Sequence, residues 1–495
     1  MGKYLTSPPK ITTMPPGVPY IVGNEAAERF SYYGMNGILT IFMTKYLTDK
    51  MGHLSVMQPA IAEGWYHTFV STLYFLPIFG AVLADAVFGK FWVVFWISIV
   101  YCAGHATLAL MGSSVAHLIE PRYLLAIGLV LIAIGAGGIK PCVSTNVGDQ
   151  FGETNKHLLT RVFNWFYFSI NAGSAISTLL IPWLLEPGSL WDWLKNLLPV
   201  PVADFLVSPR LHSPDVAFGL PGVFMALATV IFWMGRKKFV HIPPVGLRNY
   251  AREIFNRETG KIILNVLMPV PFVAIFWALW QQNFSSWIVQ AESMNRRLFG
   301  VEWLSSQIQT VNPIFILIML PLFAYWLYPL VEKIVPLTPL RKIGAGLFVT
   351  AASFFIVALI QTRIDAGARP NVIWQIWAFV VLTAGETLVS PTHLEFSYTQ
   401  GPVKLKSLIM CTYLLAISLG NVFTAAVNFL IQNPDGSVKL HGASYFMFFV
   451  WVMLGTAVLF AIVTPFYKGK TFLQNQTEVT GEAEPAIGFA VQPEA

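Results

Sequence analysis

The sequence predicts an all-α membrane protein with twelve transmembrane helices arranged in two six-helix halves. Hydrophobic residues make up 55% of the 495 residues and charged residues only 11%, which inverts the balance that a soluble protein needs to cover its surface. The charges stand in short islands between apolar runs of about 20 residues, the length that a helix needs to cross the hydrocarbon core of a bilayer. A soluble protein with a very apolar core would leave so many runs of this length unexplained, so we exclude that class.

Twelve such runs follow one another along the chain. Lipid offers the backbone no hydrogen-bond partner, so each run is expected to form a helix that satisfies its own polar groups. The runs are centred near residues 35, 73, 101, 131, 173, 226, 275, 320, 351, 382, 418 and 455.

The loops between the runs divide the chain into five segments. We expect a cytoplasmic N-terminal segment over 1–20, one six-helix bundle over 21–235 and a second over 263–470. The stretch 236–262 is rich in Lys and Arg and is predicted to be a cytoplasmic linker that is too short to hold two more spans. The polar tail over 471–495 carries too little apolar surface to fold alone, so disorder is expected there.

The distribution of positive charge predicts the orientation. Most of the 31 Lys and Arg residues fall in segments on the same side as the N-terminus, which indicates a multi-pass protein of the cell membrane with both termini in the cytoplasm. Several prolines in the first 20 residues stand where a signal peptide would have its apolar region, so the first span is expected to direct insertion. The net charge of +6 is spread over loops, and we therefore expect no nucleic-acid partner.

Twelve spans in two halves are typical of secondary transporters, in which substrate binds between halves that rock about it. Residues 80–90 read GAVLADAVFGK, and Gly80, Asp85, Gly89 and Lys90 resemble the loop motif of the major facilitator superfamily, without its usual basic residue after the Asp. The alternative interpretation is an ordinary helix-ending turn with Gly89 as its cap. A metal or disulfide framework is not expected, because the three cysteines lack the necessary spacing.

Ionisable residues inside the spans are the strongest functional signal. Each costs about 2.5–3.5 kcal/mol at the centre of a span and is kept where it pairs or meets water. In the first span Glu25, Glu28 and Arg29 stand at i, i+3 and i+4, so one helical face holds all three. The fourth span ends near Lys140. These groups either form static pairs that join helices or carry protons and substrate.

The tenth span contains two candidates, Glu386 and Glu395. They are nine residues apart, about 180° around an ideal helix, so both can face one cavity only if Pro391 breaks the helix. Of the two we favour Glu395. His67, Asn171, Asn312 and Trp277 are further polar or aromatic candidates, although a structural role in helix packing explains each of them almost as well.

The string EAAERFSYYG at 25–34 resembles the ExxERFxYYG motif of the proton-dependent oligopeptide transporter family, a branch of the major facilitator superfamily. Other segments are similar to those of the family as well, so the resemblance covers most of the chain. They are YHTFVSTLY from 66, GIKPCVSTNVGDQF from 138, FYFSINAGS from 166, TVNPIFI from 310 and EFSYTQGP around Glu395.

The resemblance implies a role for each matching residue. The proton-coupling residues would be Glu25, Glu28, Arg29, Lys140, His67 and Glu395. The substrate-binding residues would be Arg29, Tyr32, Tyr33, Tyr74, Lys140, Asn171, Trp277, Asn312 and Glu395. Glu395 would meet the amino terminus of a peptide and pair with Lys140 when no peptide is bound.

Two positions depart from the family pattern. Many members have an Arg and an acid where this chain has Asn36 and Gln281, and that pair closes the outer gate. We predict that the two amides form a neutral, hydrogen-bonded gate instead.

These features predict a proton-coupled symporter that imports di- and tripeptides by alternating access, works as a monomer and uses protons as coupling ion without a cofactor or metal. The alternative is a carrier of the same fold for nitrate, an amino-acid derivative or a drug-like compound. The chain contains no HExxH, no GxSxG and no paired aspartates within a span, so an enzyme is not expected. A receptor without net flux is the remaining alternative.

Overall fold

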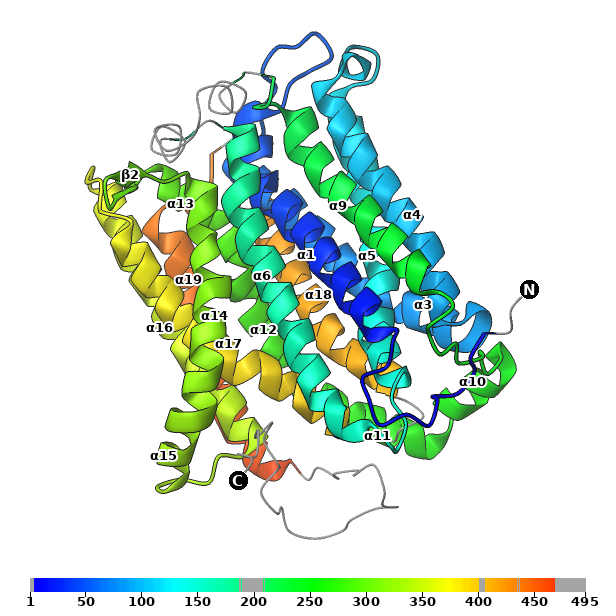
Figure 1. Cartoon of the computed structure of the whole chain (residues 1–495). Coiled ribbons are helices and arrows are strands. Elements are labelled where there is room, and N and C mark those ends of the chain that lie inside the picture. Colours follow the sequence, from blue (N-terminus) through cyan, green and yellow to red (C-terminus); the bar gives the residue numbers. More distant parts are fainter. Residues whose placement is uncertain are drawn as a thin grey trace.

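The computed structural model describes residues 4–186, 188, 208, 210–399, 406–433, 435 and 437–467. The described part is a bundle of long helices that run side by side (Figure 1). The predicted tail over 471–495 lies outside the described residues.

The first half contains six long helical stretches, several of them in more than one piece. They are α1 (Val18–Ile41) continued by η1 (Phe42–Tyr46), α2 (Pro59–Phe75) with α3 (Pro77–Val82) and η2 (Leu83–Phe88), α4 (Lys90–Ala109), α5 (Pro121–Asp149), α6 (Leu159–Leu185) and α9 (Pro214–Gly235).

The second half also contains six, preceded by two shorter helices, α10 (Leu247–Ile254) and α11 (Arg257–Leu267). The six stretches are α12 (Val270–Trp280) with η6 (Gln281–Phe284) and α13 (Ser286–Glu292), η7 (Ser305–Thr310) with α14 (Val311–Leu322), η8 (Phe323–Leu327) and α15 (Tyr328–Glu332), α16 (Pro339–Asp365), α17 (Ile373–Thr399), α18 (Lys406–Ile431) and α19 (Ala443–Val463). A two-stranded hairpin, β1 (Arg297–Leu298) and β2 (Val301–Glu302), joins α13 to η7.

The number of spans agrees with the prediction. Within the described residues ten helical stretches are long and apolar enough to cross a membrane, and eleven if the bent pair over 259–267 and 270–292 is one span. The remaining predicted span is α1, whose 24 residues are long enough to cross but carry Glu25, Glu28 and Arg29. The predicted linker over 236–262 holds α10 and the first part of α11.

Each half packs through close helix pairs. In the first half α1 lies against α6 and α9, and α4 lies against α5; in the second half α16 lies against α17 and α19, and α12 against α18. Small residues allow the closest approaches, as membrane helices require because lipid supplies no hydrophobic drive between them. A Cβ atom added at Gly104 of α4 would lie 2.9 Å from the carbonyl oxygen of Gly128 of α5.

The two ends of the bundle differ, and we name them by their landmarks. The linker end carries α10, α11, the start of α1 and the end of α19, and the hairpin end carries β1, β2 and the loop between η1 and α2 (Figure 1). The halves contact each other along α2 and α18 and where α6 meets α14 and η7.

Candidate functional site

The three charged residues of α1 form the compact group that their spacing predicts. Nε of Arg29 lies 2.6 Å from Oε1 of Glu25 and 3.2 Å from Oε2 of Glu28. Both glutamates are buried, and α1 is helical throughout, so positions i, i+3 and i+4 share one face. The single guanidinium therefore serves two buried carboxylates.

Lys140 joins this group from α5. The charged groups that act on it are those of Arg29, Glu28 and Glu25. Its Nζ lies 4.4 Å from the ring centre of Tyr32 and 5.2 Å from that of Tyr74, and these aromatic faces attract a cation. Within the described residues Nζ has no hydrogen-bond partner. The first half thus brings two acids and two bases together, which we call the N-half cluster (Glu25, Glu28, Arg29, Lys140).

The second half presents a buried carboxyl group, that of Glu386 on α17. Its Oε2 accepts hydrogen bonds from Nδ2 of Asn312 on α14, at 2.7 Å, and from Nε1 of Trp280 on α12, at 2.8 Å. Asn312 also donates to the hydroxyl of Thr383, one turn before Glu386, at 3.0 Å. Three helices of the second half therefore converge on one carboxyl group.

The structure corrects our choice between the two glutamates of the tenth span. The helix α17 continues through Pro391, so Glu386 and Glu395 lie on opposite faces. Glu395 is only partly buried and lies near Lys342 and Tyr328. The predicted pairing of Glu395 with Lys140 is wrong in this structure, because the charged groups acting on Lys140 all belong to α1. A membrane helix tolerates an internal proline when neighbouring helices satisfy the freed backbone group.

Two tyrosines lie within electrostatic reach of both Arg29 and Glu386. Tyr33 of α1 lies within electrostatic reach of both Arg29 and Glu386. Tyr413 of α18 likewise neighbours Glu386, Tyr33 and Arg29. Arg29 of the N-half cluster and the carboxyl group of Glu386, on opposite halves, therefore have Tyr33 and Tyr413 as shared neighbours.

The other predicted binding residues surround this region. The ring of Trp277 lies edge-on to Trp280, with centroids 5.2 Å apart, and to Tyr413, at 5.9 Å. Asn171 donates to the backbone oxygen of Tyr167 within α6, at 3.0 Å, and Tyr167 neighbours Glu386. The amide of Asn171 is therefore engaged within its own helix.

His67 connects the two halves. Its Nδ1 lies 2.7 Å from Oδ1 of Asn421 on α18, and its Nε2 lies 3.0 Å from the hydroxyl of Ser285. Since the amide nitrogen of Asn421 donates to Ile417, Oδ1 is the acceptor toward His67, and Nδ1 carries the proton. Nε2 then accepts from Ser285. Both ring nitrogens have partners in this state, and a proton-carrying role of His67 stays a prediction.

The two amides of the predicted gate are linked through a third residue. Nδ2 of Asn36 donates to the hydroxyl of Tyr66 at 3.1 Å, and that hydroxyl lies 3.5 Å from Oε1 of Gln281. Neutral groups therefore link Asn36 and Gln281 across the halves, but Tyr66 mediates the link, and its second contact is long for a hydrogen bond. A gating role of the two amides stays a prediction.

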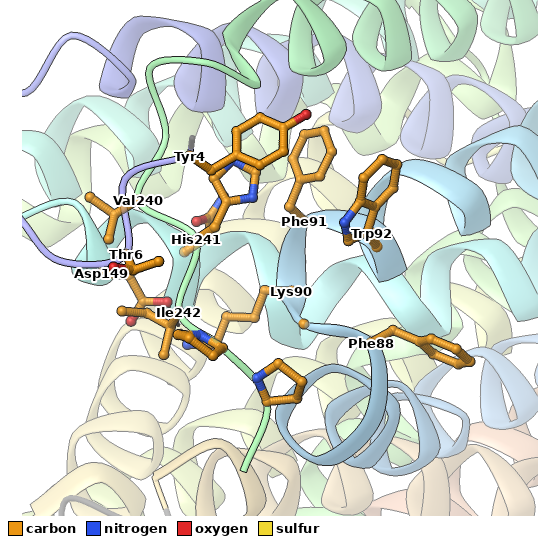
Figure 2. Close-up of a pocket in the computed structure, with 14 residues that line it drawn as sticks. Tyr4, Thr6, Phe88, Lys90, Phe91, Trp92, Asp149, Val240, His241 and Ile242 are labelled. Atoms are coloured by element: carbon orange, nitrogen blue, oxygen red, sulfur yellow. Dashed lines mark hydrogen bonds and ion pairs between the residues drawn. The ribbon is translucent and has the colours of Figure 1, made fainter. Parts of the chain in front are cut away.

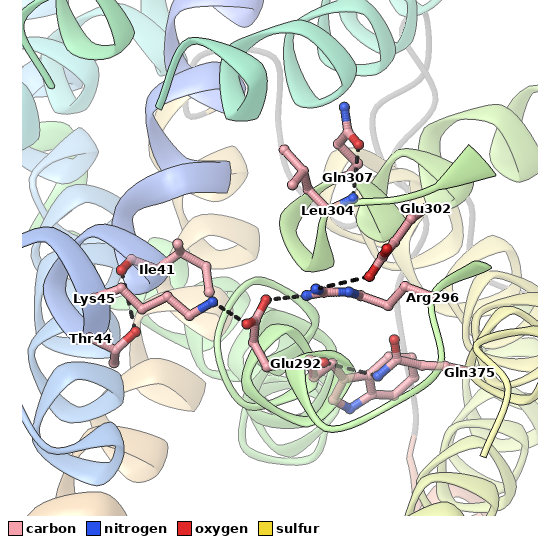
Figure 3. A network of polar contacts seen from close by, with 10 residues as sticks. Ile41, Thr44, Lys45, Glu292, Arg296, Glu302, Leu304, Gln307 and Gln375 are labelled. Carbon is pink, nitrogen blue, oxygen red and sulfur yellow. Dashed lines mark hydrogen bonds and ion pairs between the residues drawn. The ribbon is translucent and has the colours of Figure 1, made fainter. Parts of the chain in front are cut away.

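An ionic contact between the halves lies further toward the hairpin end. Glu292 of α13 bonds with Lys45 of η1 and with Arg296, and Arg296 lies 4.0 Å from Glu302 of β2 (Figure 3). Sequence reasoning missed this network, since Lys45 and Glu292 stand near the ends of their spans and resemble ordinary flanking charges. We call the three residues Lys45, Glu292 and Arg296 the ionic latch.

Further hydrogen bonds between the halves gather at the same end. Thr40 donates to the backbone oxygen of Phe284 at 2.9 Å, and Gln309 donates to that of Gly37 at 3.2 Å. A Cβ atom at Gly37 would lie 2.6 Å from the Gln309 side chain, so α1 and η7 touch closely here. The hairpin end is thus closed between the two halves.

A separate pocket of about 230 Å³ lies at the linker end (Figure 2). Its wall includes Lys90, which pairs with Asp149 of α5 at 2.6 Å, and the ring of Tyr4, which stacks on His241. Gly89, with φ of +81°, caps the end of the preceding helix, which is the alternative interpretation given above for the loop motif. The ion pair of Lys90 with Asp149 connects that turn to α5. Within the described part of the chain, His, Cys, Asp and Glu form no group of three or more that could hold a metal ion.

Comparisons with known proteins agree on one family. A model of the POT family matches residues 91–256 and 247–447. Solute carrier family 15 member 2 of Rattus norvegicus is 33% identical over 406 residues, which are 74% of this chain and 52% of that protein. Peptide transporter 3 of Caenorhabditis elegans is 33% identical over 393 residues, or 72% of this chain and 52% of that protein. The chain spans about half the length of these animal relatives.

Solved structures are similar over almost the whole chain. The crystal structure of the POT family transporter PepTSo has a TM-score of 0.77 at 32% identity and covers 92% of this chain and 99% of its own. That of an auto-inhibited POT family peptide transporter has a TM-score of 0.76 at 29% identity, over 94% of this chain and 99% of its own.

Proposed function

The chain belongs to the POT family, and we propose that it is a proton-coupled symporter that imports di- and tripeptides by alternating access. The observation that carries the proposal is a pole of opposite charge on each half. Arg29 and Lys140 form the positive pole on the first half, and Glu386 forms the negative pole on the second. Tyr33 and Tyr413 lie near Arg29 and Glu386. A peptide has a carboxylate at one end and an ammonium group at the other, whatever its side chains. Recognition of the two ends allows one site to accept many peptides.

The charge balance of the N-half cluster supplies a coupling mechanism. With two acids and two bases the cluster is neutral, and Arg29 is fully engaged by Glu25 and Glu28. One added proton on a carboxylate leaves a net charge of +1 and frees a base. The peptide carboxylate restores neutrality, and an uncompensated buried charge would be costly. Proton and peptide therefore favour each other's binding.

At the other pole Glu386 would receive the amino terminus of the peptide, the role that we first expected of Glu395. Asn312 and Trp280 position this carboxyl group through two hydrogen bonds. An arriving ammonium group would exchange with one of these donors. Asn312 is then free to bond the peptide backbone, which agrees with its predicted role.

The proton supplies the driving force. One charge that crosses a potential of 100 mV yields about 2.3 kcal/mol, enough for roughly fiftyfold accumulation before any pH gradient is added. We further propose that the protein lies in the cell membrane, with both termini in the cytoplasm and the hairpin end on the extracellular side. It would act as a monomer, with the boundary between its bundles at the linker 236–262, and would have neither a cofactor nor an enzymatic activity. The closed arrangement at the hairpin end would then correspond to a transporter state that is closed toward the outside.

Uptake of labelled dialanine into liposomes tests the proposal, with and without an inward proton gradient and an inside-negative potential. We expect gradient-driven accumulation that Glu28→Gln abolishes. Glu153→Gln is the matched control, because Glu153 is a carboxylate exposed in the loop between α5 and α6, away from the cluster. Absence of both uptake and dialanine binding in the unmodified protein would instead favour another small solute as substrate.

A further inference from the structure

Glu63 is a buried carboxyl group that the mechanism above does not use. It lies in the second turn of α2, near the hairpin end, and is 5% exposed. Its Oε2 lies 3.4 Å from the hydroxyl of Tyr445 on α19. That hydroxyl accepts a hydrogen bond from Asn428 of α18 at 3.2 Å. Since α2 belongs to the first half and α18 and α19 to the second, the carboxyl group is enclosed by the contact between the halves.

The packing around Glu63 is tight enough to exclude solvent. A Cβ atom at the adjacent Gly64 would lie 2.7 Å from the ring of Phe429, so α2 and α18 touch at this level. Trp65 packs edge-on against the same ring, at a centroid distance of 5.7 Å. The contact between the halves therefore covers Glu63 in this closed arrangement.

Glu63 also forms part of a polar stripe between α2 and α18. One turn deeper on α2, His67 bonds to Asn421, and one turn further Ser418 donates to the backbone oxygen of Ser71 at 2.9 Å. Asn421 and Asn428 are seven residues apart on α18, which places them on one face. Of the titratable groups in this stripe, Glu63 lies closest to the hairpin end.

No positive charge compensates Glu63 in the described part of the chain. The hydroxyl of Tyr445 is the group that acts on it. Other charged groups on elements packed against α2 are engaged elsewhere: Lys45 of η1 and Glu292 of α13 pair with each other, and Lys140 and the α1 residues form the N-half cluster. On α5, Arg122 donates to the backbone and hydroxyl oxygens of Ser55, and Asp149 pairs with Lys90. His67, on α2 itself, has partners on both ring nitrogens. A carboxylate left here without its proton would be a buried, unpaired charge.

We propose that Glu63 is a proton-binding residue that makes closure of the hairpin end depend on the pH of the outer medium. The inference rests on the proposed function for the direction in which the hairpin end faces. When the halves separate there, water reaches Glu63 and the carboxyl group ionises, as exposed glutamates do above about pH 4.3. Closure takes up one proton, and acid therefore favours the closed state.

The cycle at Glu63 carries no net proton across the membrane. The proton enters from the outer medium when the hairpin end closes and returns to the same side when it reopens. Glu63 thus adjusts how readily the transporter closes after loading, whereas the N-half cluster couples proton flow to uptake. Loss of Glu63 alters the pH profile of transport and leaves the accumulation ratio unchanged.

The test measures the distance between spin labels on the two halves at the hairpin end, in substrate-free protein in lipid. Labels at Leu118→Cys and Leu430→Cys suit this, because both side chains are exposed and belong to different halves. The unmodified pair should shift toward the closed distance as the pH falls from about 8 to about 5. In Glu63→Gln, which mimics the protonated form, the closed-to-open ratio at the higher pH should rise at least about tenfold and lose its pH dependence.

Two further variants keep the result interpretable. Glu63→Asp should retain a pH transition, displaced in midpoint, because it keeps a carboxyl group at the interface. Glu120→Gln, at the start of α5 near the hairpin end, should behave like the unmodified protein. An unchanged midpoint and amplitude in Glu63→Gln would overturn the proposal. Dialanine uptake separates the two hypotheses, since failure of the unmodified protein to transport it refutes the proposed function but leaves the distance titration valid.

Discussion

The ionic latch offers a direct measurement of what holds the hairpin end closed. Within the ionic latch, the bond between Lys45 and Glu292 is the one that crosses between the halves, because Glu292 and Arg296 both belong to the second half. Lys45→Met removes this bond and leaves Glu292 paired with Arg296. The variant therefore reports the bond between the halves without leaving a carboxylate unpaired.

The structure sets the expected magnitude. The side chains of Lys45 and Glu292 are 35% and 21% exposed, so the pair lies between an exposed ion pair, worth about 0.2–1 kcal/mol, and a buried one, where removing a partner costs about 3–5 kcal/mol. We expect Lys45→Met to destabilise the closed state by about 1 kcal/mol, which is about a fivefold change in the closed-to-open ratio. Glu292→Gln should cost more, because Lys45 and Arg296 then face each other without the carboxylate between them.

The assay is the same distance measurement between labels at Leu118→Cys and Leu430→Cys, for Lys45→Met, Glu292→Gln and the double variant. A coupling energy near 1 kcal/mol in this cycle, falling as salt rises, is expected for a partly exposed ion pair. The reasoning is refuted if the distance distribution of Lys45→Met matches that of the unmodified protein and the two substitutions add within about 0.3 kcal/mol.

Three further predictions follow from local contacts. Asn36→Arg and Gln281→Glu, made singly and together, should show coupled effects on transport. Because Tyr66 mediates the contact of the two amides, Tyr66→Phe should reduce the coupling that they show in the unmodified protein. Strictly additive effects on transport would contradict the contact. Asn312→Ala should lower the free energy of unfolding by about 1.5–3 kcal/mol, seen as a lower Tm, because it deletes a hydrogen bond to the buried Glu386; an unchanged Tm would show that the bond contributes nothing. Burial lowers the pKa of His241, so the folded state favours its neutral form. Docking of the N-terminal segment beside His241 should therefore weaken as the pH falls below about 6.5, and hydrogen exchange at residues 4–8 measures this. His241→Phe keeps the ring stack with Tyr4 and should make the docking insensitive to pH.

The buried charges show where sequence reasoning succeeds. Glu25, Glu28 and Arg29 were predictable as one group because they are close in sequence and the geometry of a helix alone brings them together. Lys140 could be assigned to the site as a costly charge inside a span, but its partners on α1 and the aromatic faces of Tyr32 and Tyr74 depend on how α5 packs.

The choice between Glu386 and Glu395 shows where sequence reasoning fails. Their opposite orientation follows from nine helical residues, yet which of them faces the interior depends on the rotation of α17 against α12 and α14. Glu63 escaped notice for a related reason. It stands so near the start of its span that its burial is only apparent once α18 and α19 cover it.

The sequence by itself determined the membrane class, the number of spans, the division into halves and the local charge group of α1, because composition, run length and helical spacing are properties of neighbouring residues. The tertiary structure decided which groups from different helices meet. Lys45 and Glu292 are separated by 247 positions, and His67 and Asn421 by 354. No local rule relates residues so far apart, since their contact depends on how two six-helix halves, each folded on its own helix pairs, close against each other at the hairpin end.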